Sequence, residues 1–134
     1  MNDADLLQRI AQTLKEEIAP AVDAEYPKTQ AFMAAVVLQK LGRQLALAPA
    51  HAIAAVADVE ALVAELRVMA PDAPPAIRDA VEDLARRRDA AALCRLIEAL
   101  YAVREPLGRR FEELLARVRR TLGTDIERRL EFAE

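Results

Sequence analysis

Apolar residues recur at three- and four-residue spacing along almost the whole chain, which is the periodicity of amphipathic α-helices. In the first such segment, which should start after Asp3 as its N-cap and run to about Ala19, the apolar stripe that we expect to face the core consists of Leu6, Leu7, Ile10, Leu14 and Ile18. No segment alternates apolar and polar residues as a half-buried β-strand does. The pattern therefore predicts an all-α fold, a compact bundle of about six to seven helices.

Prolines interrupt this pattern. Proline lacks an amide N–H and its ring crowds the preceding turn, so each one ends, starts or kinks a helix. We expect a second helix over residues 27–47 and a third over 49–69. The sequence leaves open whether Pro20, Pro49 and Pro106 break these helices or only kink them.

The clearest linker is the segment APDAPP at residues 70–75, whose three prolines preclude a continuous helix. Four further helices should follow it, and the last should begin after Gly123 at the capping-box sequence of residues 124–127. Each half of the chain is too small for a robust core. We therefore expect a single helical domain over residues 1–134, with a candidate hinge at 70–75.

The second predicted helix is unusual because residues 31–38, AFMAAVVL, are apolar on every side. Such a helix must be surrounded by other helices or by a partner chain. Two explanations stay open: the segment is the buried centre of the bundle, or it is an apolar surface for a second copy or a protein partner. The candidate interaction residues are Phe32, Met33, Val36 and Val37.

Composition removes most catalytic and metal-binding chemistry. The 134 residues include no Ser, one His, one Cys and three Gly. Serine-based acyl transfer and glycine-rich phosphate loops are therefore excluded, and one His and one Cys leave too few ligands for the usual metal sites. We predict no catalytic residue, no metal and no cofactor, so the chain is not expected to be an enzyme. Cys94 is expected to be a small buried apolar residue.

Histidine is the residue type whose ordinary pKa lies near neutrality, and His51 is the only one in the chain. Its neighbours in sequence are apolar, which favours a structural role. The alternative is a small-ligand-binding or enzymatic helical protein with a pocket near His51, for which Tyr26 and Thr29 would form a polar mouth. That alternative requires a cleft and carboxylates beside the imidazole.

The formal net charge of −3 gives no overall positive field that would attract nucleic acid or anionic lipid. Arginines are frequent near the C-terminus but are interleaved with acidic residues, a pattern typical of an ion-paired helix surface. The alternative, an Arg-rich DNA-binding regulator, would depend on Arg117 and Arg120. We do not expect the chain to bind nucleic acid.

We expect a cytoplasmic protein that does not enter the membrane. The N-terminal segment MNDADLLQRI is acidic and amphipathic, unlike a signal peptide. The longest uncharged stretch, residues 44–57, is too short to span a bilayer. A lone Cys also suits a reducing compartment.

Residues 14–47 carry an acidic helix end with proline and small apolar residues (EEIAPAV), a turn, and an apolar helix ending in the basic, Leu-rich segment LGRQLAL. This arrangement resembles an uncharacterised bacterial all-helical family associated with aminoglycoside-phosphotransferase-like kinases and acyl-CoA dehydrogenases. Residues 35–38 depart from the family, in which an Asn is usual within the helix. The resemblance implies an accessory domain without catalytic residues of its own, serving such a kinase or acyl-CoA enzyme.

Overall fold

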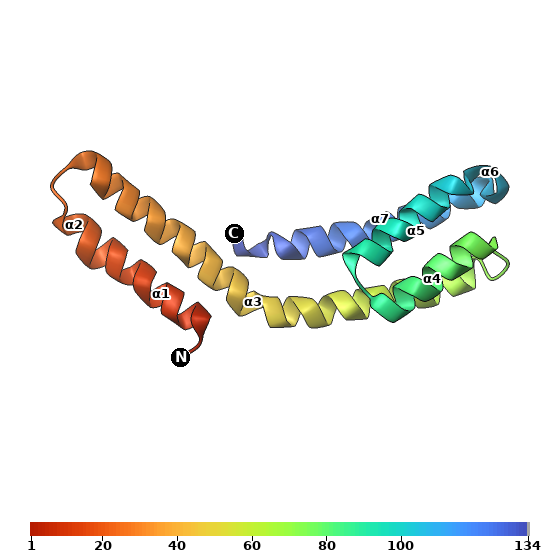
Figure 1. Cartoon of the computed structure of the whole chain (residues 1–134), viewed down its shortest axis with the longest axis horizontal. Coiled ribbons are helices and arrows are strands. Elements are labelled where there is room, and N and C mark those ends of the chain that lie inside the picture. The colour runs from red at the N-terminus through yellow and green to blue at the C-terminus, as the bar shows by residue number, and fades with distance from the viewer. Residues whose placement is uncertain (134) are drawn as a thin grey trace. The chain divides into compact units, whose positions relative to one another are not determined.

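The computed structural model describes residues 1–133, and these form helices and connecting turns with no strand, which confirms the predicted all-α fold class (Figure 1). The chain divides into two compact units. We call Met1–His51, together with the residues from Arg129 onward, the hairpin unit, and Ala52–Arg128 the bundle unit. The division falls at His51 and Arg129, whereas the proline-rich segment 70–75 lies inside the bundle unit.

The hairpin unit begins with a helix that runs in three parts, α1 (Asp3–Thr13), a π-helical turn (Leu14–Ile18) and α2 (Ala19–Ala21), and a short connection then leads into α3 (Glu25–Met69). The N-cap of α1 is Asn2, whose side chain accepts a hydrogen bond from the Asp5 amide at 2.9 Å. The Asp5 carboxylate accepts in return from the Asn2 amide at 3.3 Å. This reciprocal capping box satisfies amides that have no partner inside the helix.

The π-helical turn has a local cause in the sequence. Pro20 has no N–H to donate to the carbonyl four residues earlier, and its ring crowds that turn. Ala19 donates instead to the carbonyl of Leu14, five residues earlier, and the wider turn carries the helix on to Ala21. The helix therefore continues through Pro20, but its hydrogen-bond register shifts by one residue.

Pro49 likewise does not end a helix. The two helices expected over 27–47 and 49–69 are one continuous helix, α3, of 45 residues. Pro49 removes the hydrogen bond to the Leu45 carbonyl, but more than four helical turns on either side keep their own bonds.

In the bundle unit, the second half of α3 packs with α4 (Pro75–Arg87), α5 (Ala90–Ala102), the single turn α6 (Arg104–Leu107) and α7 (Arg109–Arg129) around one core (Figure 1). The largest side chains with less than 2% exposure are Leu62, Leu84, Leu96, Leu100, Leu114 and Val118. Every one of these helices contributes to the same cluster, so burial of large aliphatic side chains holds the unit together.

Tight turns connect the helices of the bundle unit. Arg88 ends α4 in the left-handed conformation (φ 55°), and Asp89 caps α5 by accepting from the Ala92 amide at 2.7 Å. Gly108, with φ 58°, makes the turn between α6 and α7, where a side chain would be strained. The predicted break after Gly123 is wrong: α7 continues through it, and Thr124 donates its hydroxyl to the Arg120 carbonyl at 3.0 Å instead of capping a new helix.

Candidate functional site

The two helices of the hairpin unit meet along a seam of small residues. Ala4 and Ala11 lie seven residues apart in α1, and Ala35 and Gly42 lie seven apart in α3. All four are buried. Seven residues are close to two helical turns, so each pair lies on one side of its helix. We call Ala4, Ala11, Ala35 and Gly42 the small-residue seam.

Gly42 shows how closely the helices approach. A Cβ atom added at Gly42 would lie 2.8 Å from the Gln8 side chain and 3.3 Å from the Ala4 carbonyl oxygen. Gln8 also donates from its side-chain amide to the Gln39 carbonyl at 3.1 Å. The backbones are therefore within reach of one another's side chains, which only a small residue at position 42 permits.

This seam corrects the apolar stripe predicted for the first helix. Leu7 and Leu14 are half-buried as expected, but Leu6 (47%), Ile10 (42%) and Ile18 (46%) are exposed. Ala19 is fully buried although it lies eight residues after Ala11, because the π-helical turn adds one residue to the spacing. The buried side of α1 and α2 thus follows the alanines, and large side chains face outward.

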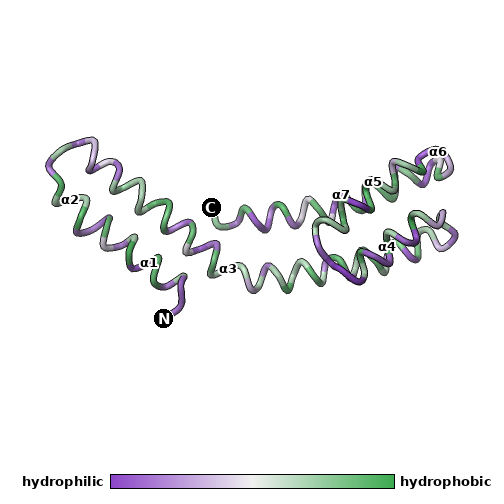
Figure 2. The backbone as a smooth tube through the Cα atoms, viewed as in Figure 1, coloured by the Kyte–Doolittle hydropathy of each residue, from purple (hydrophilic) through white to green (hydrophobic). Residues whose placement is uncertain are grey.

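The same arrangement leaves a row of large apolar side chains uncovered on α3. Met33, Val37, Leu41 and Leu45 follow one another at four-residue spacing with exposures of 57, 54, 44 and 48%. Phe32 and Val36 form a second row beside them, at 38 and 42%. We call these six residues the α3 ridge; hydrophobic positions recur along this part of α3 in Figure 2. Residues 31–38 are therefore not the buried centre of a bundle, and the four candidate interaction residues are exposed.

The hydropathy of α3 also shows how apolar this helix is. This helix is the one described helix long and apolar enough to cross a membrane, with a mean hydropathy of 1.5 over its most apolar window and 17% of that window buried. Core helices of water-soluble proteins can pass the same test of length and composition. The finding agrees with the exposure of the α3 ridge: this helix lacks the cover that so apolar a sequence normally has.

The structure does not bring together the three residues suggested for a ligand pocket. Tyr26 and Thr29 lie in the first turns of α3 and are exposed. His51 lies 22 residues beyond Thr29 in the same helix, which at 1.5 Å per residue is roughly 33 Å away. The three cavities lined by residues of the bundle unit include none of them.

His51 instead has a structural partner. Its Nε2 lies 2.8 Å from the Glu131 carboxylate, with 20% of the imidazole exposed. Lys40 donates to the Ala133 carbonyl at 2.8 Å, so two side chains of α3 hold the C-terminal 3₁₀ turn (Glu131–Ala133). Both contacts lie within the hairpin unit. A single carboxylate beside the imidazole, from the turn that follows α7, is an anchoring contact.

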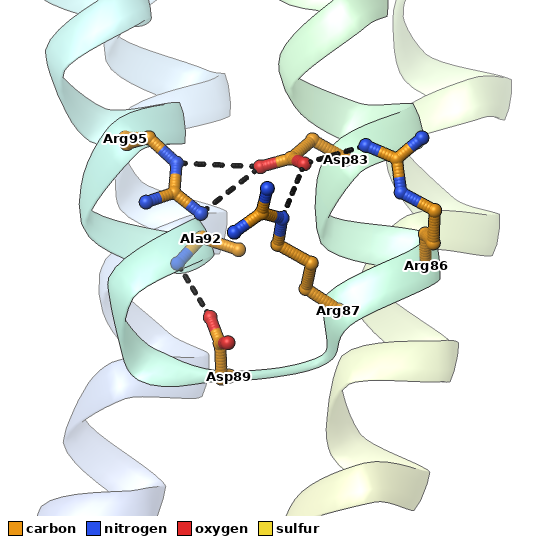
Figure 3. A network of polar contacts seen from close by, with 6 residues as sticks. All are labelled: Asp83, Arg86, Arg87, Asp89, Ala92 and Arg95. Carbon is orange, nitrogen blue, oxygen red and sulfur yellow. Dashed lines mark hydrogen bonds and ion pairs between the residues drawn. The ribbon is translucent and has the colours of Figure 1, made fainter.

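Arginines of the bundle unit are largely engaged by carboxylates. Asp83 in α4 accepts hydrogen bonds from Arg86 at 2.8 Å and, across to α5, from Arg95 at 3.1 Å, and it forms an ion pair with Arg87 at 2.9 Å (Figure 3). Partial burial raises the pKa of the Asp83 carboxyl. The hydrogen bonds from Arg86 and Arg95 and the nearby positive charges lower this pKa by a larger amount, so the net shift is downward.

Other arginines pair across the bundle unit. Arg117 in α7 binds Glu65 in α3 and donates to the buried hydroxyl of Thr121 at 2.7 Å, and Arg128 lies 2.6 Å from Asp58. Arg110 holds the pKa of Asp72 below its ordinary value through a 2.6 Å hydrogen bond. Of the two arginines on which DNA binding would depend, Arg117 is committed to Glu65. These ion pairs between arginines and carboxylates connect neighbouring helices at the surface of the bundle unit.

The prediction of a buried Cys94 is wrong, because the thiol is exposed. The buried face of α5 consists of Ala92, Leu93, Leu96 and Leu100, and Cys94 lies on the exposed side of the helix. Among residues 1–133, no three His, Cys, Asp or Glu side chains gather where they could hold a metal ion.

Comparison of the chain with protein-family models, with curated proteins and with solved structures finds no match in any of the three.

Sequence reasoning named Phe32, Met33, Val36 and Val37 as candidates but left burial and exposure of this part of α3 both open, and it missed the seam that exposes it. The signal was present: small residues seven apart, Ala4 with Ala11 and Ala35 with Gly42, on two segments joined by a short connection. The weight given to large apolar residues concealed it, because alanine buries little area and contributes little to an apolar stripe.

Proposed function

We propose that this chain is a non-catalytic interaction protein that associates with a second copy of itself through the α3 ridge. The observation that carries the proposal is the exposure of Met33, Val37, Leu41 and Leu45 as one continuous row. Such a row, flanked by Phe32 and Val36, is typical of a surface that a binding partner covers.

The geometry of the ridge suits a helix as its partner. Side chains at four-residue spacing form the ridges that fit into the grooves of a neighbouring helix. From Met33 to Leu45 the row extends for roughly 18 Å along the axis. Six large side chains, each 38–57% exposed, amount to several hundred Å² of apolar surface, the size at which an exposed patch marks an interaction site.

A second copy is the occupant that this surface fits best. A two-fold dimer places the same patch against itself, so one helical ridge supplies both sides of the interface. Two hairpins packed in this way form a four-helix arrangement in which the ridge becomes a core. Lys40 and Arg43, both exposed and close to the ridge, stay at the rim, where charges remain in water.

On this proposal the chain acts as an accessory module. Its described residues offer ion pairs and packing contacts, and a dimeric helical scaffold can support a larger enzyme without taking part in the chemistry. The kinds of enzyme are those that the family resemblance implies, a phosphotransferase-like kinase or an acyl-CoA dehydrogenase, acting in the cytoplasm.

The experiment is light scattering coupled to size-exclusion chromatography, followed by sedimentation equilibrium. The wild-type chain is expected at twice the monomer mass of 14.8 kDa. The double variant Met33→Glu/Val37→Glu places two like charges inside the interface of each copy. We expect the dimer dissociation constant to rise at least about a hundredfold, because burying unpaired charges is costly.

The matched control is Ile53→Glu/Val68→Glu. These two residues lie in the same helix with exposures of 74 and 81%, but in the bundle unit. This variant should keep the wild-type mass. A wild-type monomer at 100 µM, or equal loss of association in both double variants, would contradict the proposal. A monomer that floats with phosphatidylcholine vesicles would contradict it too, and would assign the ridge to a membrane.

A further inference from the structure

The bundle unit contains an apolar cavity of about 350 Å³ that opens to the surface beside α4. Its inner wall is made by side chains from α4, α5 and α7, among them Ile77, Leu96, Leu100 and Val118, each less than 5% exposed. The volume lies within the range of small-molecule sites, and the wall has the apolar character of such sites.

Polar groups are confined to one side of this cavity. Its lining residues include the charged side chains of Arg67, Arg78 and Glu82, all in exposed residues. Arg67 donates to the Glu82 carboxylate at 2.7 and 3.2 Å, so these two neutralise one another across α3 and α4. Arg78 has no carboxylate partner among residues 1–133. The cavity therefore has an apolar interior and one uncompensated positive charge at its rim.

An apolar body with a single negative head group matches this distribution. A guanidinium binds a carboxylate through two parallel hydrogen bonds, which gives geometry as well as charge. An apolar cavity of about 150 Å³ accommodates benzene, so 350 Å³ corresponds to roughly a dozen non-hydrogen atoms. A straight-chain carboxylate of about ten carbons has that size.

We propose that the bundle unit binds medium-chain carboxylates, with the alkyl chain in the cavity between α3, α4, α5 and α7 and the carboxylate on Arg78. The site lies wholly within the bundle unit and does not involve the α3 ridge. It is therefore independent of the proposed self-association, and either can fail without the other.

Calorimetric titration of the full chain with decanoate and with decanol, both below their aggregation limits, tests the site. Decanoate should bind with one site per chain and raise Tm, since a ligand that binds only the folded state stabilises it. Decanol has the same chain without the charge and should bind at least about tenfold more weakly.

Two variants locate the head group. Arg78→Ala should weaken decanoate at least about tenfold and leave decanol unchanged, because only the carboxylate loses its partner. Arg109→Ala, another exposed arginine with no carboxylate partner in the described chain and outside the cavity lining, is the matched control and should bind both ligands as the wild type does. Ala73→Leu adds a larger side chain to the wall and should weaken both ligands together.

Absence of decanoate binding at 1 mM would overturn the proposal. Equal affinity for decanoate and decanol would also overturn it, and so would an equal loss of decanoate affinity in Arg78→Ala and Arg109→Ala. Either result would show that the charge of Arg78 does not contribute to binding. If Ala73→Leu does not fold, the comparison of Arg78→Ala with Arg109→Ala decides alone, because both positions are exposed.

Discussion

The hairpin unit and the bundle unit are built from the same kind of element, yet they bury opposite kinds of side chain. In the bundle unit the fully buried residues include Leu62, Leu84 and Leu96. In the hairpin unit they are alanines such as Ala11, Ala19 and Ala35, while Leu6, Ile10 and Ile18 are exposed. Equal helical content thus conceals a large difference in buried apolar area.

That difference has consequences for stability and for association. A buried leucine contributes about 1.5–3 kcal/mol, whereas an alanine methyl group contributes far less. The close approach of the backbones along the small-residue seam adds dispersion contacts, which replace part of the stabilisation that large buried side chains would provide. The hairpin unit is therefore weakly held by its own contacts and keeps apolar surface available, whereas the bundle unit is self-sufficient.

The largest expected effect contrasts a leucine from each unit. Leu62→Ala removes a fully buried side chain of the bundle unit and should lower the free energy of unfolding by about 2–5 kcal/mol, through lost burial and the cavity left behind. Leu6→Ala, at a side chain 47% exposed, should cost less than about 1 kcal/mol. Urea unfolding in the Met33→Glu/Val37→Glu background, where the chain is expected to be monomeric, measures both. Equal losses would abolish the contrast.

The next test acts on the seam itself. Gly42→Leu forces a large side chain against Ala4 and Gln8 and should destabilise the hairpin unit by about 1–3 kcal/mol. Gly123→Leu is its control, because an added Cβ there meets nothing within 4 Å. In the helical interior of α7 the control should stabilise the chain by about 0.5–1 kcal/mol.

Hydrogen exchange read separately over residues 3–42 and 58–128 locates these changes. Gly42→Leu should accelerate exchange in the first region and leave the second unchanged. Acceleration in the bundle unit would show that the seam supports both units.

An effect of similar size concerns a turn of the bundle unit. Gly108→Ala places a Cβ on a residue with φ 58° and ψ −125°, a conformation that non-glycine residues avoid, and should cost about 1–3 kcal/mol. Because the hairpin unit is not involved, the dimer mass measured by light scattering should not change. Loss of the dimer in this variant would mean that association depends on the bundle unit.

The smallest effect is electrostatic and confined to acid. The pKa of Asp83 is lowered in the folded chain by Arg86 and Arg95 against the opposing effect of burial. Its stabilisation is therefore present above the unfolded pKa of about 3.9 and is lost as the pH falls through the folded value. Asp83→Asn should make unfolding less steep in pH below about 4 than in the wild type, as followed by circular dichroism. Asp79→Asn, an exposed acid on the same helix, should retain the wild-type slope.

Much of the fold was predictable because helical periodicity and capping are local properties. The all-α class and the presence of further helices after residues 70–75 follow from spacing that a single segment carries. The positions of the helix ends were less predictable. Local rules favour a boundary at Pro49 and at Gly123, yet α3 continues through Pro49 with long helix on both sides, and α7 continues from Gly123 to Arg129.

The candidate sites divide in the same way. Phe32, Met33, Val36 and Val37 could be named as candidates because a helix that is apolar on every side must be covered. The sequence did not decide whether other helices of the chain or a partner provide that cover. The cavity beside Arg78 was not identifiable, since its wall draws on four helices whose relative placement no local pattern encodes. The suggested grouping of Tyr26, Thr29 and His51 fails for a related reason: one continuous helix keeps them apart.

The sequence by itself determined that this chain forms helices, which of them are amphipathic, and that serine nucleophiles and glycine-rich phosphate loops are absent from it. Tertiary structure decided which side of each helix is buried. In the bundle unit large side chains interdigitate and exclude water. In the hairpin unit the close approach at Gly42 brings the backbones together and turns the large side chains outward. The physical reason is that burial is a property of pairs of surfaces, whereas periodicity belongs to one helix at a time.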